Sequence, residues 1–249
     1  MLVSHKYKFI FLKTIKTASS SVFDFFTPFC LPAKKLKKEN DDHYLKDKYI
    51  GFYKTGIVGN FEEKIHAKKR HVSCSEVKKI LDNIDAKIWN TYFKFCVVRN
   101  PWDLCVSRFF WIEIALKKND LTKNVRLKFK DMIEKAYDTF KNKNKDKYFA
   151  IEKPEEIYKL DGKYICDFHI KYENLKDDIK TVCEKCNIEN YDLKNLLNLK
   201  SGIRDKSIHY SYYYNDYLKN LVAEIYKDDI EKFNYKFESN NTTKDQQLL

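Results

Sequence analysis

Two short stretches of this chain carry residues that suit the binding of phosphate groups. One is a lysine followed by small and hydroxyl-bearing residues: Lys16, Thr17, Ala18, Ser19, Ser20 and Ser21. The other starts with an arginine and ends with a serine: Arg99, Asn100, Pro101 and Ser107. Lysine and arginine are the usual cationic partners of phosphate, and hydroxyl groups add neutral hydrogen bonds. The two stretches therefore predict an anion-binding protein.

Arg99 follows a segment that has the pattern of a buried strand. Residues 93–98 are apolar apart from one lysine and are rich in aromatic and β-branched side chains, which is typical of a covered parallel strand. Asn100 is a good helix N-cap, and Pro101 suits the first helical position. We therefore expect Arg99 at the carboxyl end of a strand, beside a helix N-terminus, where open α/β sheets bind anions. The alternative interpretation of Arg99 is a structural ion pair with Asp103.

Lys16 lies in a loop between an expected strand over residues 7–12 and a helix from about residue 22. This order places backbone N–H groups, an ammonium group and hydroxyls around one anion. The nucleotide-triphosphatase loop needs glycines before its lysine, and residues 1–50 contain none. Arg99 also stands where such proteins end a strand with a metal-binding aspartate. We therefore expect lysine and arginine, and no metal ion, to neutralise the phosphate.

In order and context, the two stretches resemble motifs of the sulfotransferases that use 3′-phosphoadenosine 5′-phosphosulfate (PAPS). Residues 16–21 are similar to the 5′-phosphosulfate loop of that family, and the stretch from Arg99 is similar to its 3′-phosphate motif. Residues 209–237 are similar to the C-terminal part of the carbohydrate branch. Ile15 and Ser19 depart from the family pattern, which has proline and glycine there. Ser19 restricts the loop if its position needs a positive φ.

The resemblance implies a P-loop-like α/β fold with three layers, in which helices flank a central parallel sheet. It implies a single domain over residues 1–238, and residues 239–249 are expected to form a disordered tail. The implied reaction moves the sulfuryl group of PAPS to a hydroxyl, here assigned to a carbohydrate, and releases adenosine 3′,5′-bisphosphate. The acceptor region is expected within residues 34–63 and 113–160, where the match to the family is poorest.

The resemblance also assigns roles to individual residues. Lys16 is the expected catalytic cation, and the donor ligands are Lys16, Thr17, Ala18, Ser19, Ser20, Ser21, Arg99, Ser107, Arg204 and Lys206. His66 is the expected general base, because a neutral imidazole can take the hydroxyl proton at neutral pH. His71 is a close rival for that role, and Glu62 and Glu63 follow. The alternative interpretation of His66 is a surface histidine in a basic segment.

Composition sets limits on the class of protein. The chain has 249 residues, of which 43% are hydrophobic, with five glycines and four prolines, which suits one α/β domain rather than a turn-rich sandwich. Its formal net charge of +12 fits a doubly phosphorylated donor and permits an anionic acceptor. A solvated, lysine-rich surface explains that charge equally well. We expect no nucleic-acid partner.

Cys183 and Cys186 form a C-x-x-C pair, but there is no second pair at the spacing of a zinc site. We therefore expect all seven cysteines to be reduced and most of them to be buried. The chain enters a strand almost at its start and has no apolar run of about 18 residues. We therefore expect no signal peptide and no membrane span, and a soluble, cytoplasmic enzyme.

Periodicity predicts further elements. We expect a strand over residues 164–170 and helices over residues 101–117, 129–140 and 215–233. Ser75 is the expected N-cap of one more helix, in which Ile84 lies at core spacing. The neighbouring tyrosines 212–214 are expected in the core.

Two rival functions remain at this point. One is a small-molecule kinase with a divergent phosphate loop, which would depend on Mg²⁺ and ATP. The other is a basic protein without catalytic activity that binds polyanions through its lysines, in which case salt should weaken binding broadly.

Overall fold

A computed structural model describes residues 1–32, 50–59, 72–116, 124–142, 155–199, 202–205 and 207–240. The chain forms two compact units. Unit 1 comprises Met1–Val98 and Lys153–Leu199, and unit 2 comprises Arg99–Glu152 and Lys200–Leu249. The single domain expected over residues 1–238 stays a prediction.

Unit 1 contains a six-stranded mixed sheet in the order β3-β4-β1-β2-β5-β8. Its strands are β1 (Leu2–Ser4), β2 (Phe9–Leu12), β3 (Ile50–Tyr53), β4 (Gly56–Gly59), β5 (Phe93–Val98) and β8 (Phe168–Lys171). β2, β5 and β8 are parallel, whereas β1 is antiparallel to both β2 and β4, and β3 is antiparallel to β4. The α/β class is confirmed, and the expected parallel sheet is limited to three strands.

Short connections explain the antiparallel half of the sheet. Tight turns over residues 5–8 and 54–55 join β1 to β2 and β3 to β4, and a turn of this length can join only antiparallel neighbours. The first turn also shortens the strand expected over residues 7–12, because Lys8 has a φ of 51° and belongs to the turn. β5 matches the predicted strand at both ends.

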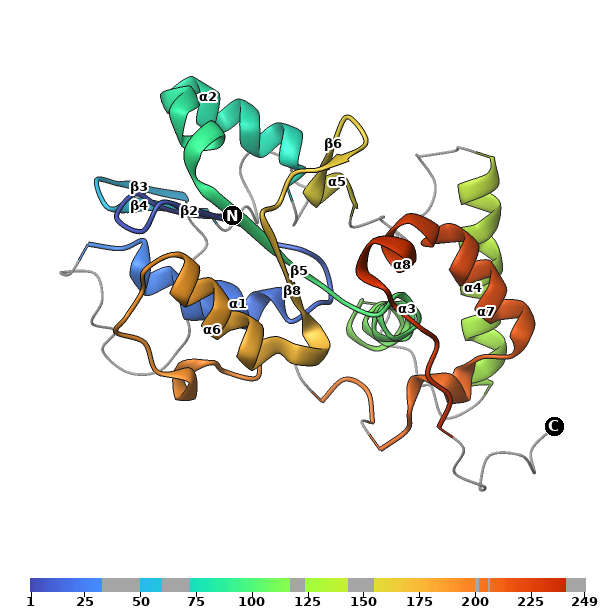
Figure 1. The fold of residues 1–249 in the computed structure, drawn as a ribbon. Helices are drawn as coiled ribbons and strands as arrows, with labels where there is room; N and C mark the ends of the chain where they lie inside the picture. The colour runs from blue at the N-terminus through green and yellow to red at the C-terminus, as the bar shows by residue number, and fades with distance from the viewer. Residues whose placement is uncertain are drawn as a thin grey trace. The chain divides into compact units, whose positions relative to one another are not determined.

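Unit 1 has helices on both faces of the sheet. Figure 1 shows α1 (Ser19–Phe26) and α6 (Leu175–Lys185) on one side of β5 and β8, and α2 (Cys74–Thr91) on the other. The α1 and α6 side packs a continuous apolar core against Phe9, Phe11, Phe95 and Val97. A short helix, α5 (Glu155–Tyr158), leads into a hairpin of β6 (Lys159–Leu160) and β7 (Lys163–Tyr164). The strand expected over residues 164–170 is therefore divided between β7 and β8.

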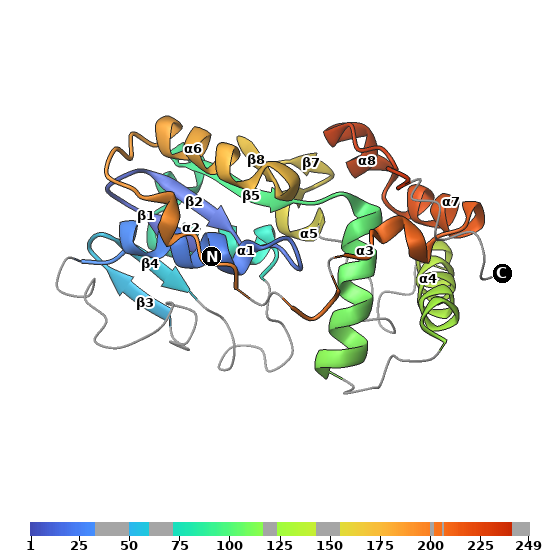
Figure 2. The same cartoon turned by 90° about the horizontal axis from the view of Figure 1, so that it is seen from below.

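All the regular elements of unit 2 within its described residues are helices or helical turns. It contains α3 (Pro101–Phe110), a π-helical turn (Trp111–Leu116), α4 (Val125–Lys141), a 3₁₀ turn (Tyr210–Tyr213), α7 (Asp216–Ile225) and α8 (Lys227–Phe233). α4 and α7 lie side by side in both views (Figures 1 and 2), and aromatic side chains such as Phe109, Phe129 and Tyr214 fill the core. The helix expected over residues 215–233 is interrupted at Tyr226, whose φ of −108° and ψ of 24° end α7. Tyr213 and Tyr214 are buried, as expected, whereas Tyr212 is half-buried and packs against that core.

The start of α2 corrects one prediction. Ser73, not Ser75, is the N-cap, because Glu76 closes a capping box with it: the Glu76 N–H donates to Ser73 Oγ, and the Ser73 N–H donates to Glu76 Oε2. Ile84, expected at core spacing, is 48% exposed. It precedes a kink at Asp85 that turns the helix away from its first direction.

None of the seven cysteines, all of which lie in the described residues, forms a disulfide. No helix in the described parts of the chain combines the length and apolarity needed to span a bilayer. From residue 241 onward the expected tail lies outside the described residues.

Candidate active site

In unit 1, the loop that carries Lys16 joins β2 to α1 and has an unusual backbone. Lys16 and Ala18 both have left-handed conformations, with φ of 59° and 60°. For residues other than glycine this region costs about 1–2 kcal/mol. Backbone strain of this kind concentrates at ligand-binding sites. Ser19 is not among the residues with positive φ, so the condition under which it would restrict the loop is not met: it occupies the first helical position of α1.

Buried hydroxyls hold this loop against β5. Thr14 Oγ1 donates to the Val97 carbonyl at 2.6 Å and lies 2.7 Å from Thr17 Oγ1. Since the Thr14 proton is used on Val97, Thr17 is the donor in the second bond. Ser19 Oγ donates to the Thr14 carbonyl. The side chains of Thr17 and Ser19, expected as ligands, therefore hydrogen-bond within the protein.

Ser21 is a second anchor of the same segment. It is buried, and its Oγ accepts a hydrogen bond from the Leu199 N–H at 3.2 Å. The contact ties the first turn of α1 to a part of the chain 178 residues away. Ser21 thus differs from its neighbour Ser20, which is only half-buried.

The outward side of the loop has the character of an anion cradle. Lys16, Ala18 and Ser20 are half-buried, and α1 has no acidic residue in its first turn and no side-chain cap at Ala18. Within the described residues, no backbone carbonyl accepts from the N–H groups of residues 17–20. Unpaired N–H groups at a helix N-terminus attract anions. The loop can therefore surround an anion with N–H groups, one ammonium and one hydroxyl.

In unit 2, α3 presents one open face. Asp103 and Ser107 are four residues apart and so lie along one side of the helix, and Arg99, which precedes the N-cap, contacts Asp103. Asp103 and Ser107 are the two half-buried residues of α3, and the other eight are buried. The helix begins as predicted: Asn100 Oδ1 accepts from the Trp102 N–H at 3.1 Å, and Pro101 is the first helical residue.

Asp103 holds two of the expected site residues together. Arg99 donates to its Oδ2 through Nε at 2.7 Å and lies 2.6 Å away through Nη2, and Arg204 donates to Oδ1 through Nη1 at 2.8 Å. Burial alone raises the pKa of Asp103, but the charges and hydrogen bonds of the two arginines outweigh it and lower that pKa below its usual value. Two guanidinium groups and one carboxylate give the Arg99–Asp103–Arg204 group a net charge of one positive unit.

The ion pair that served as the alternative interpretation of Arg99 is therefore present, and it includes Arg204. Sequence analysis named both arginines but missed Asp103 as the residue that connects them. The four-residue spacing from Arg99 through Asp103 to Ser107 was the available signal.

Several predicted residues lie outside the described residues. These are the base candidates His66, His71, Glu62 and Glu63, together with Lys206 and half of the expected acceptor region. Their roles stay predictions.

Comparison with known proteins gives a family. The family model described as "Sulfotransferase family" matches residues 1–236. An uncharacterised protein of Archaeoglobus fulgidus is 32% identical over 107 residues, which cover 43% of this chain and 77% of that protein. No solved structure matches the chain. Because the family match covers nearly the whole chain, this protein belongs to the sulfotransferase family.

Proposed function

We propose that this sulfotransferase takes the sulfuryl group from PAPS, transfers it to a carbohydrate hydroxyl and releases adenosine 3′,5′-bisphosphate. The observation that carries the proposal is the Arg99–Asp103–Arg204 arrangement beside Ser107. PAPS bears anionic groups on both its 5′ and 3′ positions, so its binding needs two cationic sites. The chain has one such arrangement in each unit, each with its own lysine or arginine.

In unit 1, we assign Lys16, Ser20 and the N–H groups of residues 17–20 to the 5′-phosphosulfate. Sulfuryl transfer, like phosphoryl transfer, passes through a loose transition state in which charge develops on the bridging oxygen of the leaving phosphate. A cation and N–H donors at that oxygen stabilise the transition state more than the bound donor. Lys16 supplies the cation. Thr17, Ser19 and Ser21 contribute through the backbone position that their buried side chains maintain.

In unit 2, we assign Arg99, Arg204 and Ser107 to the 3′-phosphate, with Lys206 as a further cation of the same loop. Each hydrogen bond between a charged group and phosphate contributes about 1.5–3 kcal/mol. Asp103 holds Arg99 and Arg204 in place before the donor arrives, so less side-chain entropy is lost on binding. The arrangement needs no metal ion to neutralise this phosphate.

For the acceptor half of the reaction, His66 is the proposed base, with His71, Glu62 and Glu63 as alternatives. A positioned base contributes about 10²–10⁴-fold in rate. The carbohydrate assignment rests on the similarity of residues 209–237 to that branch of the family. This segment is an integral part of unit 2: Asn100 Nδ2 donates to the Lys236 carbonyl at 2.9 Å, and Phe237 packs edge-on against Trp102.

Titration calorimetry distinguishes the proposal from a kinase. Adenosine 3′,5′-bisphosphate and ATP are each titrated with and without Mg²⁺. We expect the bisphosphate to bind in both conditions and more tightly than ATP. Tight, Mg²⁺-dependent ATP binding without bisphosphate binding would overturn the proposal.

A second experiment addresses the acceptor and the polyanion-binding alternative. Sulfate-labelled PAPS is incubated with the protein and a panel of mono- and oligosaccharides, together with phenolic and steroid alcohols. Label transfer to a sugar supports the carbohydrate assignment, and transfer to a phenol or steroid alone contradicts it. Binding that salt weakens equally for every polyanion, without any transfer, indicates a protein that only binds polyanions.

A further inference from the structure

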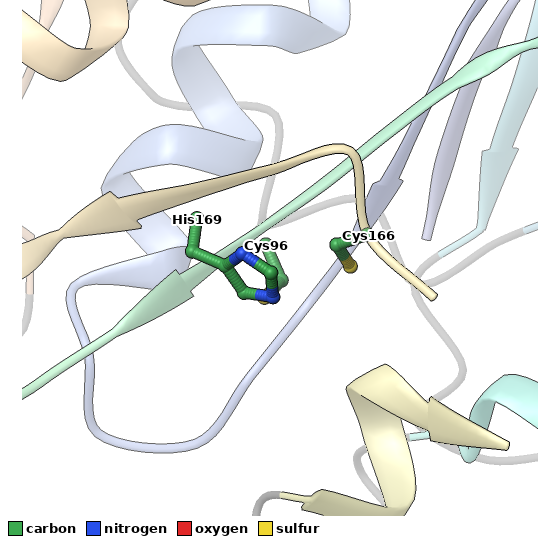
Figure 3. A group of neighbouring side chains, drawn as sticks. All are labelled: Cys96, Cys166 and His169. Atoms are coloured by element: carbon green, nitrogen blue, oxygen red, sulfur yellow. The ribbon is translucent and has the colours of Figure 1, made fainter. Parts of the chain in front are cut away.

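Unit 1 brings together two cysteines and a histidine that lie far apart in the sequence. Cys96 is in β5, Cys166 is in the segment just before β8, and His169 is in β8. Their potential ligand atoms, two sulfurs and a ring nitrogen, all lie within 4.8 Å of one another. Figure 3 shows the three side chains gathered beside the two strands. None of these residues belongs to the PAPS-binding groups assigned above.

The pairing of the strands creates this group. β5 and β8 are parallel neighbours, and Cys96 is the register partner of His169. Because side chains alternate along a strand, these two residues point to the same face of the sheet. Phe95 and Ile170 point to the opposite face, where they join the apolar core with α1 and α6. The cluster is therefore separate from that core and lies on the other face of the sheet.

Access to the group is partial. Cys96 is fully buried, whereas Cys166 and His169 are half-buried. The rings of Tyr158 and Tyr164 stand edge-on to His169 at 6.1 and 6.0 Å. An ion can reach the two half-buried ligands from solvent, while the tyrosine rings restrict the orientation of the imidazole.

We propose that Cys96, Cys166 and His169 bind one Zn²⁺ ion. Thiolate and imidazole are the ligands that Zn²⁺ prefers, whereas Mg²⁺ and Ca²⁺ need oxygen. Zn–S and Zn–N bonds of about 2.3 and 2.0 Å place tetrahedral ligand atoms about 3.4–3.8 Å apart. The three ligand atoms lie within 4.8 Å of one another, so side-chain rotations of about 1 Å at the ligand atoms suffice to reach that range. Each thiol gives its proton to solvent as its sulfur binds, and the histidine binds as the neutral imidazole.

In this arrangement, a water molecule would occupy the fourth coordination position of the Zn²⁺ ion. Cys74, at the start of α2, lies near enough to interact electrostatically with Cys166. Its thiol, however, donates to the Lys159 carbonyl at 2.8 Å. Three protein ligands and one water complete the tetrahedron, a coordination that differs from the four protein ligands of most structural zinc sites.

The ion would have a structural role. It would link β5 to β8 three residues before Arg99, so that the strand leading to the proposed 3′-phosphate ligand is fixed at its carboxyl end. Metal binding to the folded state alone raises stability by mass action. The role does not depend on PAPS chemistry, and its tests use metal content and stability instead of activity.

Metal analysis of the purified full chain tests the site directly. After dialysis against Zn²⁺ and removal of loosely bound ions, we expect one zinc per chain by mass spectrometry. Replacing zinc with Co²⁺ should give visible d–d bands of a tetrahedral complex and a near-ultraviolet thiolate-to-cobalt band. His169→Gln and Cys166→Ser, at half-buried positions that tolerate substitution, should lose the metal and both spectral features. Cys96→Ser should do the same if it folds.

The C183S/C186S double variant is the matched control, because it removes two cysteines of the same unit, buried like Cys96. It should keep one zinc per chain. A chelator should lower Tm by about 5–10 °C from its value at a hundred-fold excess of free zinc over Kd, and His169→Gln should show no such shift. Zinc retained in His169→Gln and Cys166→Ser, zinc lost from the control, or a Cys96–Cys166 disulfide in place of metal would each overturn the proposal.

Discussion

Arg99 and Arg204 bind opposite oxygens of the same carboxylate: Arg99 contacts Asp103 Oδ2 and Arg204 contacts Oδ1. The side chains of both arginines are largely buried, with 7% and 18% of their surface exposed. Residues 105 positions apart in the sequence thus form one cationic group. If the proposed role is right, Asp103 is a positioning residue, and its removal should affect binding through both arginines.

Asp103→Asn should weaken binding of adenosine 3′,5′-bisphosphate about ten-fold or more, because an amide orients two guanidinium groups less strongly than a carboxylate does. Adenosine 5′-phosphate, which lacks the 3′-phosphate, should bind the variant and the wild type alike. Calorimetry with the two ligands measures the difference. Equal losses for both ligands would indicate general unfolding of the site instead of a role at the 3′-phosphate.

The same residue predicts a loss of stability in acid. The pKa of Asp103 lies below its usual value of 3.8 because the arginine charges outweigh the effect of burial. A carboxyl group with a lowered folded-state pKa stabilises the protein above the unfolded pKa, and this contribution is lost as the pH falls through the folded pKa. The difference in free energy of unfolding between wild type and Asp103→Asn should therefore begin to shrink near the usual pKa of 3.8 and continue to shrink as the pH falls through the lower folded-state pKa. Urea unfolding at several pH values measures it, and a constant difference would contradict the assignment.

Ser19→Ala should lower the stability of the protein, whereas Ser20→Ala should weaken PAPS binding. Ser19 is buried and donates to the Thr14 carbonyl, so its loss should lower the free energy of unfolding by about 1–3 kcal/mol. Ser20 is half-buried on the outward side of the loop, so its loss should weaken PAPS binding with little change in stability. Thermal unfolding and PAPS titration of the two variants, which differ by one position, test this directly. A reversed result would move the ligand role to Ser19.

Lys16→Ala should lower kcat about 10²–10³-fold, as expected when a group that stabilises the transition-state charge is removed. Lys54→Ala is the matched control, because Lys54 is an exposed lysine in the turn between β3 and β4 of the same unit. Label transfer from PAPS measures both variants. Full activity in Lys16→Ala would exclude this lysine as the catalytic cation.

His66→Ala should lower kcat about 10²–10⁴-fold while leaving bisphosphate binding intact. Loss of an imidazole base should also remove the acidic limb of the pH–rate profile, because a protonated imidazole cannot accept the hydroxyl proton. His71→Ala serves as the parallel variant. If His71→Ala shows these effects and His66→Ala does not, the base is His71.

Local sequence patterns were sufficient for the elements around Arg99. The boundaries of β5, the cap at Asn100 and the start of α3 at Pro101 depend on side-chain periodicity and on hydrogen bonds within a few residues, both of which are visible in the sequence. The position of the Lys16 loop between β2 and α1 was also predicted from local patterns, whereas its role as an anion site stays a proposal.

Within that loop, only the tertiary structure separated inward from outward residues. Thr17, Ser19 and Ser21 look like equal candidates with Ser20 in the sequence. Their separation depends on where Thr14 and Leu199 present a partner, and Leu199 belongs to a distant segment. The left-handed backbone conformation of Lys16 and Ala18 could not be predicted from the sequence either, because neither lysine nor alanine favours it.

The sequence by itself determined the family motifs, the strand before Arg99 and the helix after it, because these follow from interactions between near neighbours. Tertiary structure decided the pairing of Arg204 with Asp103, and the mixed sheet that limits parallel pairing to β2, β5 and β8. It also placed Cys96 beside His169, where sequence analysis expected no metal. The physical reason is the same in each case: these contacts join segments far apart in the chain, so they form only when packing of the whole unit fixes which strands and loops are neighbours.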